Sequence, residues 1–413
     1  MKKEKKKIKY ALLMCFIISI FFSYSYLLRV IPSVIINDIK IKLTIDNSVF
    51  GIIIVYYYYA YTPLQILAGI IIDKYNKKYI LTIACLLCAI GTLIFFNTNN
   101  TEIAKIGRFI TGLGSAFAYI GILKIARIYL PKKYFATISG LGICIGMGGA
   151  IIGELFISKM IVIYKLKDIL NIITIIGILL SLIIFIVIKE QKEIINKQKN
   201  NKKSTIKIIK EIIKTKILWI NGIIGCLTFL PITVFAELWG IPFLEYTVKL
   251  DKITAATCSS LIFMGFCIGG PLWGLISDKI KKRKTPMLIG ILLSSIIIFD
   301  VIFNTSNKYY ILYIQLFLSG FLLSSQTLNF AIANDISNTK TSATVIAFTN
   351  TIIMLGGLII QPTIGYVLKL LENTNNISIL SFNINNFQIA MAIIPTSLII
   401  SIILIFYIEE TYK

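Results

Sequence analysis

Four ionisable side chains lie deep inside long apolar stretches of the 413-residue sequence: Arg29, Arg108, Glu154 and Glu237. Burying such a group in the middle of a membrane-spanning helix costs roughly 2.5 to 3.5 kcal/mol on insertion scales, so each is a candidate for a functional site. Arginine offers a planar fork that suits a carboxylate, and glutamate accepts hydrogen bonds from an ammonium group. The role of these four residues depends on the helices that carry them.

Those helices are predicted to span a membrane. Hydrophobic residues make up 57% of the chain and the mean hydropathy is +0.84, more than a soluble protein of this length could bury. The apolar runs approach or exceed the roughly 20 residues that a helix needs to cross a bilayer, and they lack the alternation of outer-membrane barrels. The sequence predicts an all-α membrane protein with twelve transmembrane helices, at 10 to 36, 47 to 72, 79 to 97, 102 to 130, 134 to 158, 168 to 188, 217 to 244, 253 to 277, 286 to 304, 309 to 333, 342 to 368 and 387 to 408.

The basic residues predict the orientation of these spans. The formal net charge is +23, and 29 of the 42 lysines and arginines lie in segments on the side of the N-terminus, against ten on the other side and three within spans. Positive charge marks cytoplasmic segments, so both termini are expected on the cytoplasmic side of the membrane. The first apolar run is longer than a signal-peptide core and no cleavage site follows, so we expect it to remain as a helix. The same placement favours contact with anionic lipid headgroups and argues against nucleic acid as a partner.

A Lys- and Asn-rich segment divides the spans six and six. We predict an N-terminal six-helix bundle over 1–188, a basic cytoplasmic linker over 189–216 and a C-terminal six-helix bundle over 217–413. The stretch from Ile206 to Lys214 suits an interfacial helix, with isoleucines in lipid and lysines at the headgroups, and equally suits a solvated tether.

The residues available for chemistry exclude several classes of protein. The chain has no histidine, which disfavours enzymes that use imidazole as a base or as a metal ligand, and no cofactor or metal is expected. All seven cysteines lie within apolar runs, where we interpret them as small packing residues. We find no convincing catalytic constellation, so the protein is not expected to be an enzyme.

A duplicated motif sets the two halves in register. Gly69-x-x-x-Asp73-Lys74 with two further basic residues recurs 205 residues later as Gly274-x-x-x-Asp278-Lys279. An offset of 207 aligns Ala136-Thr137 with Ala343-Thr344, and also pairs Gly149 with Gly356 and Glu154 with Gln361. Parallel repeats of this kind suit two bundles that rock about a central site.

The repeated motif resembles the signature of the major facilitator superfamily. Gly69-x-x-x-Asp73-Lys74-x-Asn76-Lys77-Lys78 looks like the signature between its second and third spans, and the segment from Arg108 to Gly114 resembles a further motif of span four. Asn76 replaces the usual glycine, and we expect it to keep a left-handed turn. The resemblance covers essentially the whole chain, and it implies a secondary transporter that works by alternating access.

Two narrower resemblances bear on the solute. The run from Gly140 to Gly153 is similar to the motif of drug-proton antiporters but has Gly149-Ala150 where they have Gly-Pro, which argues against drug efflux. The segment Tyr57-Tyr-Tyr-Ala60-Tyr61-Thr-Pro-Leu-Gln65 looks like the second helix of the bacterial phagosomal transporters, which import amino acids. Lysosomal dipeptide transporters are more distant relatives of that group.

Arg29 and Glu237 are predicted to form the substrate site. They lie about 19 and 20 residues into the first and seventh spans, which run in the same direction, so they should sit at similar depth in different bundles. One cation and one carboxylate on opposite walls of a cavity suit a zwitterion such as an amino acid or short peptide. We expect Arg29 to hold its carboxylate and Glu237 its amine.

Arg108 and Glu154 form a second candidate pair. Each is 23 residues from Pro131 in the loop between spans four and five, so neighbouring antiparallel helices would place them level. They could form a structural ion pair or face the substrate. Because the chain has no histidine, proton coupling would need a carboxyl group within a span, and Glu154, Glu237 and Asp300 are the candidates.

Other side chains are predicted to line the site or to control its access. Tyr57, Tyr61 and Gln65 recur every four residues and share one face of a helix, where they could line a cavity or anchor the helix at a membrane interface. Weaker candidates for the site are Trp239, Phe243, Gln326, Asn329 and Gln361. The basic motif is predicted to act as a conformational latch, with Asp73 paired to Arg127 and facing the start of span eleven, and the expected members are Gly69, Asp73, Lys74, Lys78, Arg127 and Asp278.

The sequence thus predicts a proton-coupled importer of small zwitterions that acts as a monomer in the lipid bilayer. Within transport, the alternative is import or export of another small organic ion. From another class, the alternative is a membrane sensor that does not transport.

Overall fold

The computed structural model describes residues 2–131, 135–189, 211–304, 309–337, 342–372, 377–379 and 382–412. Within helices and strands, the side chains at 2–6, 73, 135–137, 139, 342–343, 377–379 and 382–384 are outside this description. The predicted linker therefore falls mostly outside the described residues, and so does the side chain of Asp73.

The described chain holds twelve helical segments long and apolar enough to cross a membrane, six in each half. In the first half the helices are α1 (Lys2–Val34), α2 (Ile36–Leu43), α3 (Asn47–Lys74), α4 (Lys77–Asn97), α5 (Thr101–Ser115), α6 (Ala118–Tyr129), α7 (Phe135–Ile163) and α8 (Leu166–Val187). Helices α5 and α6 together make the fourth span, and α2 is a short helix between the first two spans.

The second half repeats the pattern with more interruptions. Its elements are α10 (Lys216–Leu230), η3 (Pro231–Trp239), α11 (Gly240–Phe243), η4 (Leu244–Val248), α12 (Lys252–Ile280), α13 (Lys284–Phe303), α14 (Tyr309–Leu323), η5 (Ser324–Thr327), α15 (Leu328–Ile336), α16 (Ser342–Leu371), α17 (Asn386–Met391) and α18 (Ile393–Ile405). A short hairpin of β1 (Ile377–Ile379) and β2 (Phe382–Ile384) precedes α17 and was not predicted. The prediction of an all-α fold with twelve spans is confirmed.

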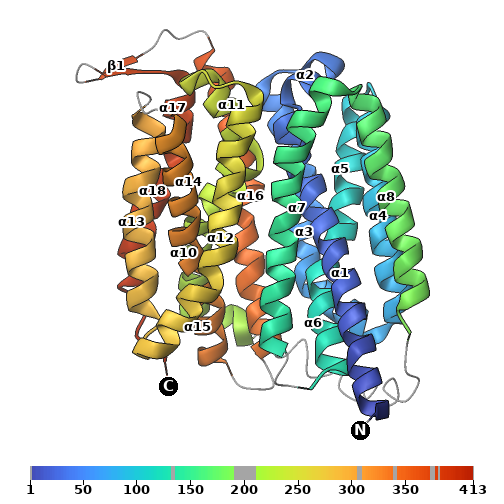
Figure 1. Cartoon of the computed structure of the whole chain (residues 1–413). Helices are drawn as coiled ribbons and strands as arrows, with labels where there is room; N and C mark the ends of the chain where they lie inside the picture. The colour runs from blue at the N-terminus through green and yellow to red at the C-terminus, as the bar shows by residue number, and fades with distance from the viewer. Residues whose placement is uncertain are drawn as a thin grey trace.

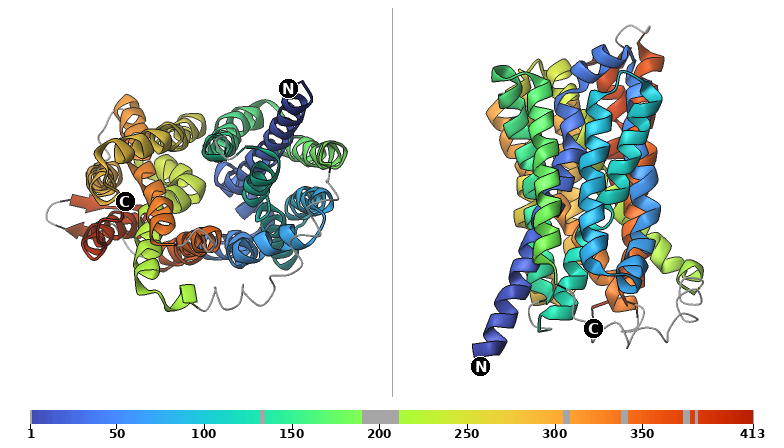
Figure 2. Two further views of the ribbon diagram at one scale, coloured as in Figure 1. Left: turned by 90° about the horizontal axis from the view of Figure 1, so that it is seen from below. Right: turned by 90° about the vertical axis from the view of Figure 1, so that its right-hand side faces the viewer.

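The spans form two six-helix bundles that stand side by side, with both chain termini at the same end (Figure 1). We call this the termini end, and we call the opposite end, which carries α2 and the hairpin, the α2 end. The bundles meet along α3 against α16 and α7 against α12. Figure 2 shows α3 and α16 in contact when the molecule is seen from below. Any group held between these helices is shared by the two halves.

Polar side chains fix where several spans begin. Asp46, Asn100 and Asp251 cap α3, α5 and α12, each accepting hydrogen bonds from backbone amides of the first turn. Asn76 does the same for α4, with an extended backbone at φ −63° and ψ 117°. The expected left-handed turn at Asn76 is therefore wrong, because its side chain is used as a helix cap. The equivalent residue of the repeat, Lys281, is left-handed at φ 54°.

The seventh span departs from α-helical geometry where it carries Glu237. Residues Pro231–Trp239 and Leu244–Val248 form π-helical turns on either side of α11. Proline lacks the amide that would continue the α-helical ladder, and wider π turns are frequent at functional sites. Because a wider turn rotates the following side chains about the helix axis, the direction of Glu237 could not be read from an ideal helix.

Glycines allow the closest helix contacts inside each half. A Cβ on Gly149 would lie 1.8 Å from the carbonyl oxygen of Ser23, and one on Gly112 would lie 2.1 Å from that of Tyr57. No side chain fits at either distance, so α7 packs directly on the backbone of α1, and α5 on that of α3. These contacts hold α1 and α3, which carry Arg29 and the tyrosines, in fixed positions.

Candidate functional site

A buried ion pair joins the two halves, nearer the α2 end of the spans than the termini end. Nη1 of Arg29 on α1 lies 3.1 Å from Oε1 of Glu237 on η3, and the two side chains are only 2% and 0% exposed. Their positions in the sequence predict similar depths on opposite walls of a cavity, and the structure instead brings the two groups into direct contact. Each charge is neutralised by the other half of the chain.

Four tyrosines surround the guanidinium of Arg29. The ring centroids of Tyr26, Tyr61, Tyr57 and Tyr58 lie 4.6, 4.8, 5.1 and 5.5 Å from its central carbon. A cation over aromatic rings in a desolvated site gains about 2 kcal/mol, so this cage partly replaces the hydration that Arg29 lost. The hydroxyl of Tyr57 also accepts a hydrogen bond from Nε of Arg29 at 3.3 Å.

Tyr58 completes the pair from the other side, because its hydroxyl donates to Oε2 of Glu237. The sequence analysis selected Tyr57 and Tyr61 by their spacing and missed Tyr58, although both Tyr57 and Tyr58 are buried while Tyr59 is 47% exposed. It also missed Tyr26. A signal for Tyr26 was available, since it lies one turn before Arg29, but spacing alone does not show that Tyr58 faces Glu237.

Arg108 is a second arginine beside the ring of Tyr57. Its central carbon is 5.1 Å from the Tyr57 ring, the same distance as that of Arg29, and its Nη1 donates to the carbonyl oxygen of Leu28 at 3.0 Å. Its Nε and Nη2 are buried and have no hydrogen-bond partner among the described residues. Unsatisfied buried donors are costly, so they mark a place where a ligand oxygen would be stabilised.

The structure does not pair Arg108 with Glu154. Arg108 is bonded to Leu28 on α1, whereas the neighbour of Glu154, Gly153, packs against Val30 of the same helix. Helix α1 therefore lies between the two charges. The equal distances of Arg108 and Glu154 from Pro131 predicted equal depth in the membrane. Spans four and five are not adjacent at this depth, so the predicted ion pair between the two residues is wrong for this conformation.

Glu154 instead contacts the second half of the chain. Its Oε1 lies 3.1 Å from the hydroxyl of Ser259 on α12, and its Oε2 is buried without a partner among the described residues. The same hydroxyl lies 3.2 Å from the carbonyl oxygen of Ala236, the residue before Glu237. The carboxyl group of Glu154 is thus linked through one serine to the helix of the ion pair.

The remaining predicted site residues make hydrogen bonds between helices. Gln65 is buried and accepts a hydrogen bond from Asn350 of α16 at 3.2 Å, which is another contact between the halves. The indole of Trp239 donates to the carbonyl oxygen of Gln361, whose amide donates to that of Thr233. These two bonds join spans seven and eleven within the second half, so Trp239 and Gln361 position η3.

The weaker candidates make contacts within single bundles. Asn329 donates to the carbonyl oxygen of Gln326, and its own carbonyl accepts from Asn221 of α10. Phe243 packs against Phe235 in the same span. Asp300 accepts hydrogen bonds from Asn304 and Gln315 near the α2 end of α13, which places it away from the contact between the bundles.

Two further ion pairs cross between the halves at the α2 end. Asp46 lies 2.8 Å from Lys369, and Asp38 of α2 lies 3.7 Å from Lys252. Burial opposes ionisation of Asp46, but hydrogen bonds from Lys369 and from the Val49 amide outweigh it, so the pKa of Asp46 is lowered. These pairs were not predicted, because their residues lie at the ends of spans or in short polar segments with no unusual spacing.

Comparison with known proteins identifies the family. Residues 12–361 match the sequence profile of the Major Facilitator Superfamily. The chain belongs to the major facilitator superfamily. Its twelve spans make it a multi-pass integral membrane protein, and its family makes it a secondary transporter, not an enzyme.

Solved structures share the fold at low sequence identity. A bacterial homologue of the human lysosomal transporter Spinster, in an inward-facing and occupied conformation, has a TM-score of 0.71 at 14% identity, covering 96% of both chains. A mutant of the nucleoside transporter NupG has a TM-score of 0.70 at 13% identity, covering 95% of this chain and 99% of the other. Curated protein sequences gave no match. These identities establish the fold and leave the solute open.

The signature motif of this major facilitator superfamily member lies at the termini end. Gly69 and the basic Lys74 and Lys78 are near the α3 to α4 turn, where Lys78 stands over the ring of Phe185 at 3.7 Å. Arg127 is exposed near the end of α6. The predicted partner of Arg127, Asp73, has its side chain outside the described residues, so their contact stays a prediction.

The copy of the motif is part of a charge cluster at the same end. Asp278 lies 2.7 Å from Arg283, which also contacts Asp335 at 3.2 Å and donates its backbone amide to Glu410. This cluster ties together the ends of α12, α13 and α15 and the C-terminal segment. Asp278 therefore stabilises one bundle, and a role in latching the two bundles stays a prediction.

Proposed function

We propose that this secondary transporter moves a small zwitterionic solute, an amino acid or short peptide, with proton-coupled uptake by alternating access. The observation that carries the proposal is the buried pair of Arg29 and Glu237, contributed by opposite bundles. Alternating access requires the bundles to separate around a central site, and this separation would break the pair.

The cost of that separation selects the solute. Removing one partner from a buried ion pair costs about 3 to 5 kcal/mol, because the other charge stays buried and uncompensated. A zwitterion replaces both partners at once, with its carboxylate on Arg29 and its ammonium on Glu237. A simple anion would leave Glu237 unpaired, and a neutral sugar would leave both charges unpaired.

Neighbouring groups favour the same arrangement of the solute. The free Nε and Nη2 of Arg108 supply a second set of donors beside the ring of Tyr57, which Arg29 also contacts. Tyr57, Tyr58 and Tyr61 offer hydroxyl groups and apolar ring faces for a side chain of the solute. The carboxylate end is therefore expected toward Arg108, and the amine end toward Glu237.

Glu154 is a better proton carrier than Glu237. Glu237 is neutralised by Arg29, whereas Glu154 is fully buried with no cation in contact among the described residues. The Ser259 hydroxyl has a single hydrogen but lies within hydrogen-bond distance of two acceptors. With that hydrogen donated to the carbonyl oxygen of Ala236, a protonated Glu154 can donate from Oε1 to Ser259, so both contacts of the hydroxyl become hydrogen bonds. Separation of the bundles would break this contact and expose the carboxyl group to water.

The arrangement in the cell follows from the same proposal. The moving units are residues 1–188 and 217–413, connected by the basic linker at 189–216, and the protein works as a monomer. The basic residues at the termini end support a cytoplasmic position for that end, in a protein of a bacterial inner membrane. In the described conformation, the interbundle ion pairs of Asp46 and Asp38 then hold the outward side together.

The test is uptake by purified protein in proteoliposomes, against a panel of the twenty amino acids and their glycyl dipeptides. Thermal unfolding identifies the member that binds, since a ligand of the folded state stabilises it. We expect uptake of that compound to fail in Arg29→Ala and Glu237→Gln and to fall when the pH gradient is collapsed. Glu102→Gln, an exposed change on α5, is the matched control.

Each part of the proposal has its own refuting result. Undiminished uptake by a folded Arg29→Ala or Glu237→Gln variant would overturn the site. Stabilisation by a sugar or organic anion, with none from any zwitterion, would overturn the solute class and favour transport of another small organic ion. Uptake that is unchanged when the pH gradient is collapsed would refute proton coupling and leave the rest of the proposal unaffected.

A further inference from the structure

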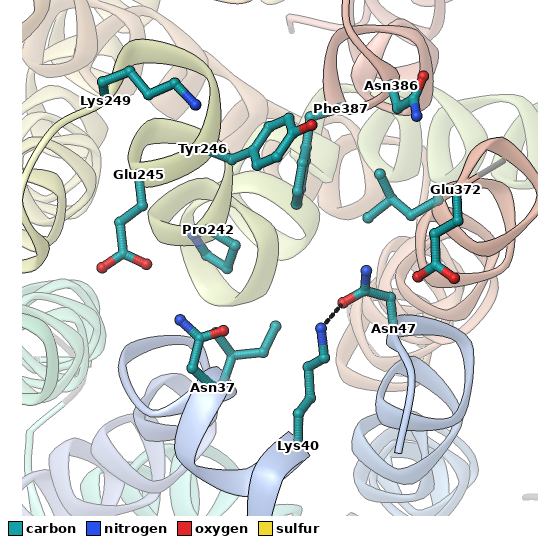
Figure 3. Close-up of a pocket in the computed structure, with 12 residues that line it drawn as sticks. Asn37, Lys40, Asn47, Pro242, Glu245, Tyr246, Lys249, Glu372, Asn386 and Phe387 are labelled. Atoms are coloured by element: carbon teal, nitrogen blue, oxygen red, sulfur yellow. Dashed lines mark hydrogen bonds between the residues drawn. The ribbon is translucent and has the colours of Figure 1, made fainter. Parts of the chain in front are cut away.

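A cavity of about 500 Å³ opens at the α2 end between the two halves of the chain. Its volume falls within the range of small-molecule sites, roughly 300 to 1,000 Å³. Asn37, Lys40 and Asn47 line it from the first half, and Glu245, Lys249 and Glu372 are among the residues that line it from the second (Figure 3). The cavity therefore exists in this form only while the halves meet at the α2 end.

The cavity wall carries charges of both signs that are not consumed by ion pairs. Lys40 is held by the side chain of Asn47 at 2.8 Å, and Lys249 stands over the ring of Tyr246 at 4.8 Å. Glu245 and Glu372 form no ion pair with any residue that the structure describes. Two cations and two carboxylates around one space suit a ligand that has both an ammonium and a carboxylate group.

An aromatic layer separates this cavity from the central ion pair. Phe387 lines the cavity, and its ring lies 6.4 Å from those of both Trp239 and Phe243. Trp239, two residues beyond Glu237, also contacts Phe50 of α3 at 5.9 Å. These four rings are nearly or fully buried, so they close the path between the cavity and Glu237 in this conformation.

We propose that the α2-end cavity is a second binding site for the transported zwitterion, in series with the central site and separated from it by the aromatic layer. This inference rests on the proposed function, since the zwitterion is the same. Lys40 and Lys249 attract its carboxylate, and Glu245 and Glu372 attract its ammonium group. Binding here brings the solute to the aromatic layer before the bundles separate, which raises the rate of capture at low concentration.

The test counts binding sites on the full chain. The probe is the tritiated amino acid or glycyl dipeptide that gives the largest thermal shift in the panel described above, measured by equilibrium dialysis. Wild-type protein should bind two molecules, and the Glu237→Gln variant should keep only the site at the α2 end. The double variant Glu245→Gln/Glu372→Gln should keep only the central site, with at least a tenfold rise in the KM for uptake, because each lost charged contact is worth about a factor of ten.

Controls separate failure of this inference from failure of the proposed function. Glu102→Gln removes an exposed carboxylate at the same end, outside the cavity, and should bind two molecules. Lys249→Gln provides a second cavity variant should the double variant not fold. One bound molecule in wild type, unaffected by either cavity variant, would overturn the second site and leave the central site standing. No binding by any member of the panel would overturn both.

Discussion

The buried pair of Arg29 and Glu237 allows a quantitative prediction by a double-variant cycle. The perturbations are Arg29→Gln, Glu237→Gln and their combination. Both side chains are at most 2% exposed, so each single change leaves one charge buried without its partner, at a cost of about 3 to 5 kcal/mol. The double variant removes both charges, and we expect it to be less destabilised than the sum of the single variants by at least 2 kcal/mol.

The two single variants should differ in their dependence on pH. In Arg29→Gln, Glu237 can become neutral by binding a proton. For a glutamate with the ordinary pKa of about 4.3, protonation at pH 7 costs about 3.7 kcal/mol. That cost falls by about 1.4 kcal/mol for each unit of acidification, so the Arg29→Gln defect shrinks as the pH is lowered. After Glu237→Gln, Arg29 has no such escape because guanidinium does not deprotonate in proteins, and the defect should stay constant.

The assay is unfolding of the detergent-solubilised protein in an SDS titration, followed by tryptophan fluorescence. A matched cycle at the exposed pair of Lys105 and Glu102, separated by 2.6 Å, should give a coupling of only about 0.3 to 0.5 kcal/mol. Additive effects of Arg29→Gln and Glu237→Gln, within about 0.5 kcal/mol, would refute the reasoning. The pair would then not be energetically coupled, and the argument that only a zwitterion can replace it would fail.

Three further predictions test other contacts. Glu154→Gln should keep exchange of labelled for unlabelled solute across proteoliposomes but lose accumulation driven by a pH gradient, and loss of both activities in a folded variant would argue against a proton carrier. Gly149→Ala should lower the free energy of unfolding by at least about 1 to 3 kcal/mol, because the added Cβ would lie 1.8 Å from a backbone oxygen. The control Gly148→Ala should be nearly neutral, because a Cβ at that position would have no atom within 4 Å. Asp46→Asn keeps the helix cap and removes the ion pair with Lys369, so it should lower the free energy of unfolding by at most about 1 kcal/mol, and by less at high salt. The pKa of Asp46 is lowered from 3.8 in the folded protein. The loss of stability should therefore be constant near neutral pH and vanish only as the pH falls through that lowered pKa.

The sequence alone determined the spans, because hydropathy is a local property and the bilayer fixes the length of each helix. The same physics identified Arg29, Arg108, Glu154 and Glu237, since a charge in an apolar run is expensive wherever the run is placed. It also predicted that Arg29 and Glu237 share a depth, because a helix rises 1.5 Å per residue from a known end. These predictions needed no knowledge of neighbouring helices.

Only the tertiary structure decided which groups touch. Depth does not say which helix lies alongside, so α1 came between Arg108 and Glu154, and Glu154 met Ser259 of the other half instead. The direction in which a side chain leaves its helix depends on packing and, for Glu237, on the π turns of η3. The contact between Glu237 and Tyr58 was therefore missed, although Tyr57 was selected. The contacts of Asp46 with Lys369 and of Asp38 with Lys252 exist only because two bundles dock at one end, and docking is a property of surfaces far apart in the sequence.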